Sequence, residues 1–132
     1  MRTNTDAMAF SGRILLALIF LLSGIGKLRG FDGTVAYIGS AGLPLPAVAA
    51  AGALTLEIVA SVALILGYRT RWAALALAAF SLLAAVLFHN WWAMPPESHV
   101  IQQIFFLKDL AIAGGLLLLA AHGPGRWAIE RR

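Results

Sequence analysis

Residues 105–115 read FFLKDLAIAGG, and the chain then stays apolar through Ala121. Lys108 and Asp109 therefore stand side by side in a stretch that is otherwise typical of a membrane-spanning helix. The hydrocarbon core of a bilayer is about 30 Å thick, and a helix needs about 20 apolar residues to cross it. A charge near the middle of such a helix costs about 2.5–3.5 kcal/mol. The sequence therefore predicts that these two residues meet partners or water inside the fold.

The composition is that of an integral membrane protein. Of the 132 residues, 61% are hydrophobic and 12% are charged, and the mean hydropathy is +0.85. Soluble domains average about 45–50% apolar and about 25% charged residues. The net charge of +4 comes from basic residues at the ends of apolar runs, which favours contact with the lipid bilayer over binding of nucleic acid. Without cysteine, the chain has no disulfide, CxxC redox motif or thiol nucleophile.

Four apolar runs divide the sequence, at about residues 10–28, 45–67, 72–92 and 100–121. Inside a bilayer the backbone must satisfy its own hydrogen bonds, so continuous apolar runs of this length are expected to be helices. No A-x-A-like cleavage site follows the first run, so we expect it to be retained and not removed as a signal peptide. The predicted fold class is all-α, a four-transmembrane-helix bundle forming a single integral membrane domain over residues 1–132.

The basic residues are distributed unevenly between the two sides of the membrane. One side carries seven of them and the other side two, while Lys108 lies within a span. The seven lie in the N-terminal segment, the second loop and the C-terminal tail; the two are in the first loop, at positions 27 and 29. Because Lys and Arg accumulate on the cytoplasmic side, both termini are predicted to be cytoplasmic.

Glu57 is the predicted partner of Lys108. Glu57 lies about 11 residues, or roughly 16 Å, from the outer start of its helix, and Lys108 lies about 8 residues, or roughly 12 Å, from the start of its own. Adjacent residues on a helix point about 100° apart, so Lys108 and Asp109 are not expected to neutralise each other. Lys27 and Arg13 are expected to extend from the span ends toward the membrane surfaces.

The ionisable residues allow two interpretations. An ionisable group within a membrane is a functional-site hypothesis by default. The first interpretation is a ligand or proton site opening outward, formed by Glu57, Lys108 and Asp109, with Lys27 and His89 near its mouth. The second is that buried polar residues only specify which helices pack together. No metal site is predicted, because His89, Glu97 and His99 lack a compact ligand spacing.

The order of several short motifs resembles the DoxX family of small bacterial four-helix membrane proteins. The resemblance covers about residues 12–130. Its elements are Arg13, SGIGK (23–27), GLPLP (42–46), Glu57, LGYRTRWAAL (66–75), FHNWW (88–92), FLKDLAIAGGLLLLA (106–120) and HGPGRWAIE (122–130). In that family the residue at position 109 is commonly asparagine, so the aspartate here adds a possible negative charge.

The resemblance implies a multi-pass protein of the bacterial cytoplasmic membrane with a redox association. Some members resemble subunits of a thiosulfate:quinone oxidoreductase, and others partner with superoxide dismutase and a sulfurtransferase. We therefore expect a redox-associated membrane subunit that binds quinone and holds no covalently bound cofactor. The alternatives are a non-catalytic anchor of a larger respiratory or redox complex and a small-molecule transporter. Small-residue faces such as Ala111 and Gly115 also suggest a homo-oligomer or another redox subunit as partner.

The topology can be tested with reporter fusions. A reporter after Arg132 should report the cytoplasm, whereas a reporter in the 93–98 loop should report the opposite compartment, because the basic residues favour the cytoplasmic side. A C-terminal reporter that is active outside the cytoplasm would contradict the predicted orientation.

Overall fold

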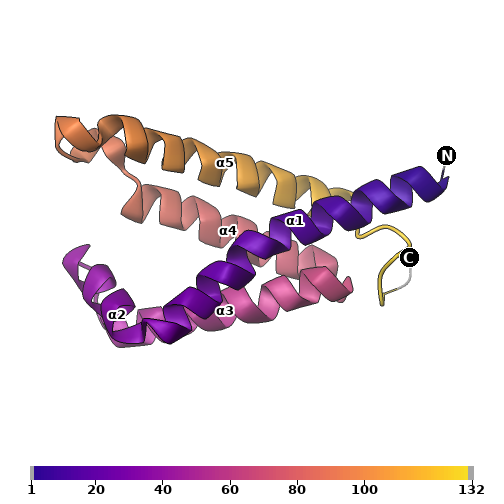
Figure 1. The fold of residues 1–132 in the computed structure, drawn as a ribbon, viewed down its shortest axis with the longest axis horizontal. Coiled ribbons are helices and arrows are strands. Elements are labelled where there is room, and N and C mark those ends of the chain that lie inside the picture. The colour runs from indigo at the N-terminus through magenta and orange to yellow at the C-terminus, as the bar shows by residue number, and fades with distance from the viewer. Residues whose placement is uncertain (1, 131–132) are drawn as a thin grey trace.

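The chain, described for residues 2–130 by a computed structural model, is a bundle of long helices (Figure 1). Over these residues there is no β-strand. The elements are α1 (Arg2–Arg29), α2 (Phe31–Ser40), α3 (Pro46–Leu66), α4 (Thr70–Phe88), two short 3₁₀ turns (Trp91–Ala93 and Pro96–Ser98) and α5 (His99–His122). Four stretches are long and apolar enough to cross a membrane, Arg2–Arg29, Pro46–Leu66, Thr70–Ala93 and Pro96–His122. This confirms the predicted fold class, and both ends of the described chain lie at one end of the bundle.

The helices form two closely packed pairs, α1 with α3 and α4 with α5, which are joined through contacts between α3 and α4. Helix α1 crosses the bundle diagonally, lying beside α5 near the N-terminal end and beside α3 at the other end (Figure 1). Close to the N-terminal end, Gly115 of α5 packs against Leu16 of α1, where an added Cβ would lie 3.3 Å from the leucine side chain. Beyond this point α1 and α5 diverge.

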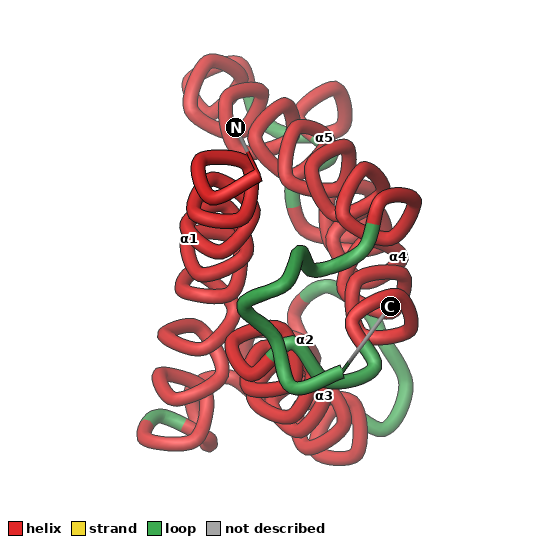
Figure 2. The backbone as a smooth tube through the Cα atoms, turned by 90° about the vertical axis from the view of Figure 1, so that its right-hand side faces the viewer, coloured by secondary structure: helices red, strands yellow, loops and turns green. Residues whose placement is uncertain are grey.

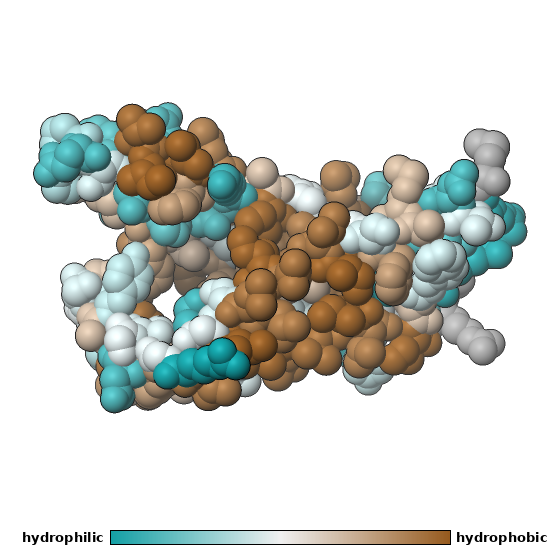
Figure 3. Space-filling model, in the orientation of Figure 1, coloured by the Kyte–Doolittle hydropathy of each residue, from teal (hydrophilic) through white to brown (hydrophobic). Residues whose placement is uncertain are grey.

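Alanine dominates the core where the helices approach most closely. Ala74, Ala78, Ala85 and Ala113 are all nearly or fully buried along the α4–α5 pair. Small residues let helix backbones approach each other, which strengthens van der Waals packing in a membrane where hydrophobic burial gives little advantage. Leu64, Leu77 and Leu116 are buried as well, but many other large apolar side chains point outward and form a hydrophobic belt between more polar ends (Figure 3).

The segment between the first two predicted spans, which was predicted only as a loop, contains a further helix. Residues Phe31–Ser40 form the helix α2, which packs against α3. Ile38 is buried in this contact, and Tyr37 stacks on Phe88 of α4 with ring centroids 5.3 Å apart. These apolar and aromatic residues stabilise a short helix that local glycine content disfavours.

Arg13 is buried at the end of the bundle that holds the termini and does not extend to the membrane surface as expected from the sequence. Its guanidinium donates to the carbonyl oxygens of Pro124 and Trp127, each at 2.6 Å, and to that of Ile65 at 3.3 Å. The side chain is only 1% exposed. One cation in α1 therefore holds the chain that follows α5 against the C-terminal end of α3.

The C-terminal segment closes this end of the bundle, as the loop crossing between the helices in Figure 2 shows. The N–H groups of Ile129 and Glu130 donate to the carbonyls of Leu66 and Gly67, and Glu130 Oε1 accepts from the N–H of Thr70 at 3.0 Å. Gly67 has φ +70°, and a Cβ there would collide with Ala128. The α3–α4 turn and the C-terminal segment are thus fitted closely together.

Replacing Arg13 by methionine should destabilise the fold. The change leaves three backbone carbonyls without their donor, and hydrogen bonds to charged groups contribute about 1.5–3 kcal/mol each, with incomplete additivity. We expect a lower midpoint of thermal unfolding in detergent for R13M. R2M, which removes an exposed arginine from the same helix, is the matched control and should leave the midpoint close to that of the original chain. Equal midpoints for the two variants would show that the Arg13 contacts contribute little.

Candidate functional site: a polar cavity between the helix pairs

Lys27 and Glu57 form an ion pair between α1 and α3, with Nζ 2.7 Å from Oε1. Glu57 is 1% exposed and Lys27 is 26% exposed, so the carboxylate is the deeply buried member. Lys27 Nζ also donates to Ser23 Oγ at 2.7 Å, one turn earlier in α1. At 2.7 Å the ammonium group compensates the charge of the buried carboxylate directly.

This arrangement corrects the predicted pairing of Glu57 with Lys108. Lys108 is exposed on α5, and no ion pair joins it to any residue within 2–130. The depth of the two residues along their helices is compatible with a contact, but the rotation of α5 is not. Because neighbouring residues point about 100° apart, turning Asp109 toward the interior directs Lys108 outward. Its long apolar stem lets the ammonium group extend toward the membrane surface.

Gly24 makes the approach of α1 to α3 possible at the ion pair. A Cβ at this position would lie 2.7 Å from Ile58 Cγ1 and 3.2 Å from Glu57 Cβ. The two helices could therefore not pack this closely with a larger residue. Gly24 of SGIGK thus serves a close helix contact, and Lys27 follows one turn later at the position facing Glu57.

His89 and Asp109 form a second polar pair, between the C-terminal end of α4 and α5. His89 Nε2 lies 3.8 Å from Asp109 Oδ2, and His89 Nδ1 lies 2.8 Å from Gln102 Oε1. With the glutamine oxygen accepting from Nδ1–H, Nε2 of the neutral ring is an acceptor. Asp109 Oδ2 is buried and has no hydrogen-bond donor among the described residues. Two acceptors thus face a space that suits a shared proton or a donor group.

Both pairs line one cavity of about 250 Å³. Its polar lining comes from α1, α2, α3, α4 and α5, and its apolar lining combines aliphatic and aromatic side chains. The polar residues are Ser23, Lys27, Thr34, Tyr37, Glu57, Ser81, His89 and Asp109, and the aromatic ones include Phe20, Phe80 and Phe88. Four of the five residues predicted for a ligand or proton site are therefore brought together, and Lys108 is not.

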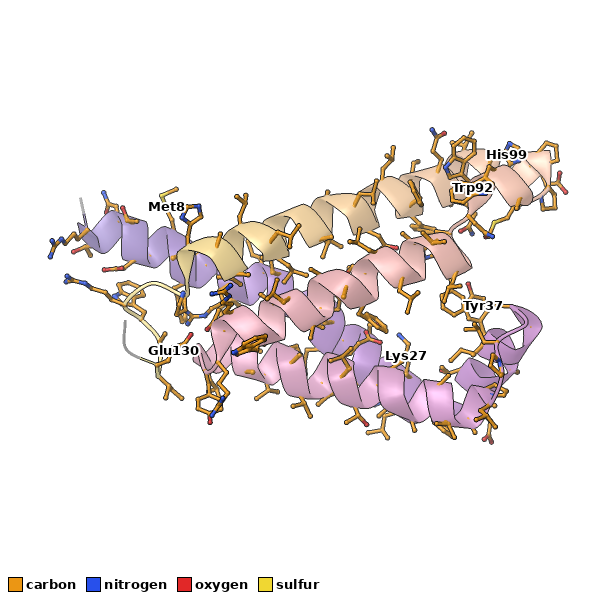
Figure 4. The ribbon with its side chains drawn as sticks, turned by 180° about the vertical axis from the view of Figure 1, so that it is seen from behind. Met8, Lys27, Tyr37, Trp92, His99 and Glu130 are labelled. Carbon is orange, nitrogen blue, oxygen red and sulfur yellow. The ribbon has the colours of Figure 1, made fainter. Side chains whose placement is uncertain are left out.

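The cavity lies at the end of the bundle away from the termini. In the space-filling view the molecule is hollowed at this end, between the α4–α5 arm and the arm formed by α1, α2 and α3 (Figure 3). Lys27 and Tyr37 both lie on the side of their helices that faces α4 (Figure 4). Ile19 belongs to the lining and is 51% exposed on α1, well within the span. The wall of the cavity that Ile19 forms therefore borders the surface that faces lipid.

Sequence reasoning missed Tyr37, Ser81 and Gln102 as residues of this region. The spacing in the sequence could have indicated two of them, because residues seven positions apart lie on the same face of a helix. Gln102 is seven before Asp109, and Ser81 is seven before Phe88, which precedes His89. Tyr37 carried no such signal, since its helix was not predicted. Over residues 2–130 no group of three metal-binding side chains is present.

These features define a class of protein, a multi-pass helical membrane protein with a cavity between its helices that is lined by polar and ionisable side chains. The DoxX family model matches residues 8–90, and the SURF4 family model matches residues 50–132. The chain belongs to the DoxX family. It is 41% identical to inner membrane protein YphA of Escherichia coli, in a match that covers 91% of this chain and 86% of that protein. It is 37% identical to inner membrane protein YqjF of the same organism, in a match that covers 99% of this chain and 95% of that protein.

A more distant relative is the Surfeit locus protein 4 homolog of Drosophila melanogaster, 32% identical over 89% of this chain and 38% of that protein. No solved structure matches the chain. With relatives that are inner membrane proteins and four helices able to cross the bilayer, the chain is a multi-pass protein of the bacterial inner membrane.

The Lys27–Glu57 pair can be tested by a double-mutant series. K27M alone and E57L alone should each lower the amount of folded protein in the membrane, because removing one member of a buried pair typically costs about 3–5 kcal/mol. The double variant K27M/E57L should recover much of that loss, since no charge is left unpaired. K108M is the matched control and should stay near the original level. A loss with K108M as large as that with K27M would contradict the pairing.

Proposed function

We propose that the cavity binds the head group of a membrane quinone and that the chain is the quinone-binding subunit of a redox system. The observation that carries this proposal is the combination of aromatic walls with proton donors and acceptors in one cavity open toward lipid. The size is suitable, because an apolar cavity of about 150 Å³ holds benzene and this cavity is larger.

The polar groups match the two states of a quinone. A quinone carbonyl accepts hydrogen bonds, and Lys27 Nζ is a charged donor at the cavity wall. A quinol hydroxyl donates, and His89 Nε2 and Asp109 Oδ2, which lie 3.8 Å apart, are acceptors for it in the cavity lining. Phe20 and Phe80 supply aromatic lining against which the ring of the head group would pack.

The lateral opening accounts for access. Membrane quinones carry an apolar tail and move within the bilayer, so their binding site must open toward lipid. The wall of the cavity that Ile19 forms borders the lipid-facing surface, where α1 and α5 diverge. The head group would enter between these helices while the tail remains outside.

Proton and electron transfer are divided between this chain and a partner. Oxidation of a quinol releases two protons and two electrons. Imidazole and carboxylate groups accept and release protons, so His89 and Asp109 would take the protons at the cavity. The electrons require an acceptor in a partner redox protein, because the chain has no cysteine and, over residues 2–130, no cluster of metal-binding side chains.

The proposal is tested by titrating the purified chain in nanodiscs with a short-tailed ubiquinone analogue and, separately, with its reduced quinol form. Quenching of tryptophan fluorescence reports binding, since Trp91 and Trp92 directly follow the cavity residue His89 and its neighbour Asn90 in the chain. D109N should weaken quinol binding about tenfold, because a hydrogen bond to a charged group contributes about 1.5–3 kcal/mol. K108M is the control with one charge removed outside the cavity, and it should bind as the original chain does.

Binding that is absent from the original chain, or equal in D109N and K108M, would contradict quinone binding in this cavity. If, in addition, cells that carry K27M/E57L kept the activities that are lost when the protein is absent, the ionisable residues would serve packing alone. The chain would then be a non-catalytic anchor of a larger complex.

A further inference from the structure

A second concave surface lies outside the polar cavity, between α3 and α4, which stand in front in Figure 4. It is an apolar groove of about 830 Å³. Small side chains form its floor, including Ala60, Ala63 and Ala73, and Val59 stands at its wall with 64% exposure. The groove ends at Tyr68 and Arg69, in the turn between the two helices.

Arg69 is held in an unusual backbone conformation at this end. Its φ is +47°, one of two positive values among the described non-glycine residues, the other being Leu45 at +49°. The left-handed region costs a side-chain-bearing residue roughly 1–2 kcal/mol. A glycine would fit this position with less strain, yet the chain has an arginine here. Local backbone preference therefore does not explain the residue.

The guanidinium at the groove end is exposed and remains charged. Arg69 Nε donates to the hydroxyl of Tyr68 at 3.3 Å, and the guanidinium carbon lies 5.7 Å from the centre of the same ring. The hydrogen bond to Tyr68 raises the pKa of Arg69. The nearby Glu130 carboxylate is engaged by the N–H of Thr70. The other guanidinium N–H groups of Arg69 have no acceptor among residues 2–130.

We propose that this groove is a binding site for one anionic phospholipid, with an acyl chain along α3 and α4 and the phosphate on Arg69. An acyl chain extends through half of the hydrocarbon core, about 15 Å. The part of the groove from Thr55 to Ala63 rises about 12 Å along α3, and the turn that carries Arg69 follows. Charge and shape therefore change along the groove in the same order as along a phospholipid, from apolar chain to anionic head group.

Arginine suits this role because its planar guanidinium donates two parallel hydrogen bonds to a phosphate. The tyrosine beside it is also typical of the head-group level, where an amphipathic ring is favoured. The groove is separate from the polar cavity, since no residue lines both. The lipid site consequently does not depend on quinone binding.

The experiment is native mass spectrometry of the purified full-length chain with phosphatidylglycerol and phosphatidylcholine of identical acyl chains. The original chain should retain one phosphatidylglycerol in preference to phosphatidylcholine. R69G should reduce the retained phosphatidylglycerol about tenfold, because a charge-assisted hydrogen bond of about 1.5–3 kcal/mol is lost. V59W should reduce binding of the same lipid by filling the groove.

Two variants are matched controls. L45G relieves the strain at the other non-glycine residue with a left-handed backbone and removes no charge. R71Q removes a neighbouring exposed arginine that does not line the groove. Both should keep the preference for phosphatidylglycerol. Glycine relieves the backbone strain at position 69. In the absence of added lipid, R69G should therefore unfold no more readily than the original chain. A loss of lipid binding in R69G can then be distinguished from a loss of folding.

Equal retention of the two lipids by the original chain would overturn the proposal. An effect of R71Q as large as that of R69G would also overturn it, by showing a general surface attraction and no defined site. A dimer in nanodiscs that V59W dissociates, without any lipid preference, would assign the groove to a second copy of the chain.

Discussion

The buried carboxylate of Glu57 is the constraint on which the arrangement of the helices depends. A negative charge in this position must be compensated, and Lys27 does so from α1 at 2.7 Å. Gly24 lets the two backbones approach closely enough for the contact. Because α1 is held against α3 here, it cannot also cover α5, and the space between the two helix pairs is left open. One ion pair thus both closes the α1–α3 contact and creates the wall of the cavity.

The other end of the bundle is built in the opposite way. There Arg13 is bonded to three carbonyl oxygens, and the C-terminal segment is laid across the helix ends. The molecule therefore has one open and one closed end. The proposed binding of a lipid-soluble molecule rests in part on this asymmetry, because a cavity closed toward the termini offers no continuous path through the bundle.

The ionisable residues of the cavity differ in how well they are satisfied. Lys27 has two oxygen partners, whereas Asp109 has only a distant imidazole. The first pair resembles a structural contact, and the second keeps capacity for a further hydrogen bond. This difference supports a division in which Lys27–Glu57 maintains the shape of the cavity while His89 and Asp109 meet the ligand. DoxX-family membership and the inner-membrane relatives are consistent with such a membrane-embedded role.

The sequence by itself determined the four spans and the fold class, because the thickness of the bilayer fixes the length and polarity of each helix locally. It also indicated Lys27, Glu57, His89 and Asp109, since ionisable residues stand out in apolar runs. Only the tertiary structure decided which of them meet. Depth along a helix can be counted from the sequence, but the rotation and tilt of that helix depend on packing against its neighbours. For this reason Lys108 was assigned to Glu57 by depth, whereas the rotation of α5 directs it outward and the diagonal path of α1 brings Lys27 in its place.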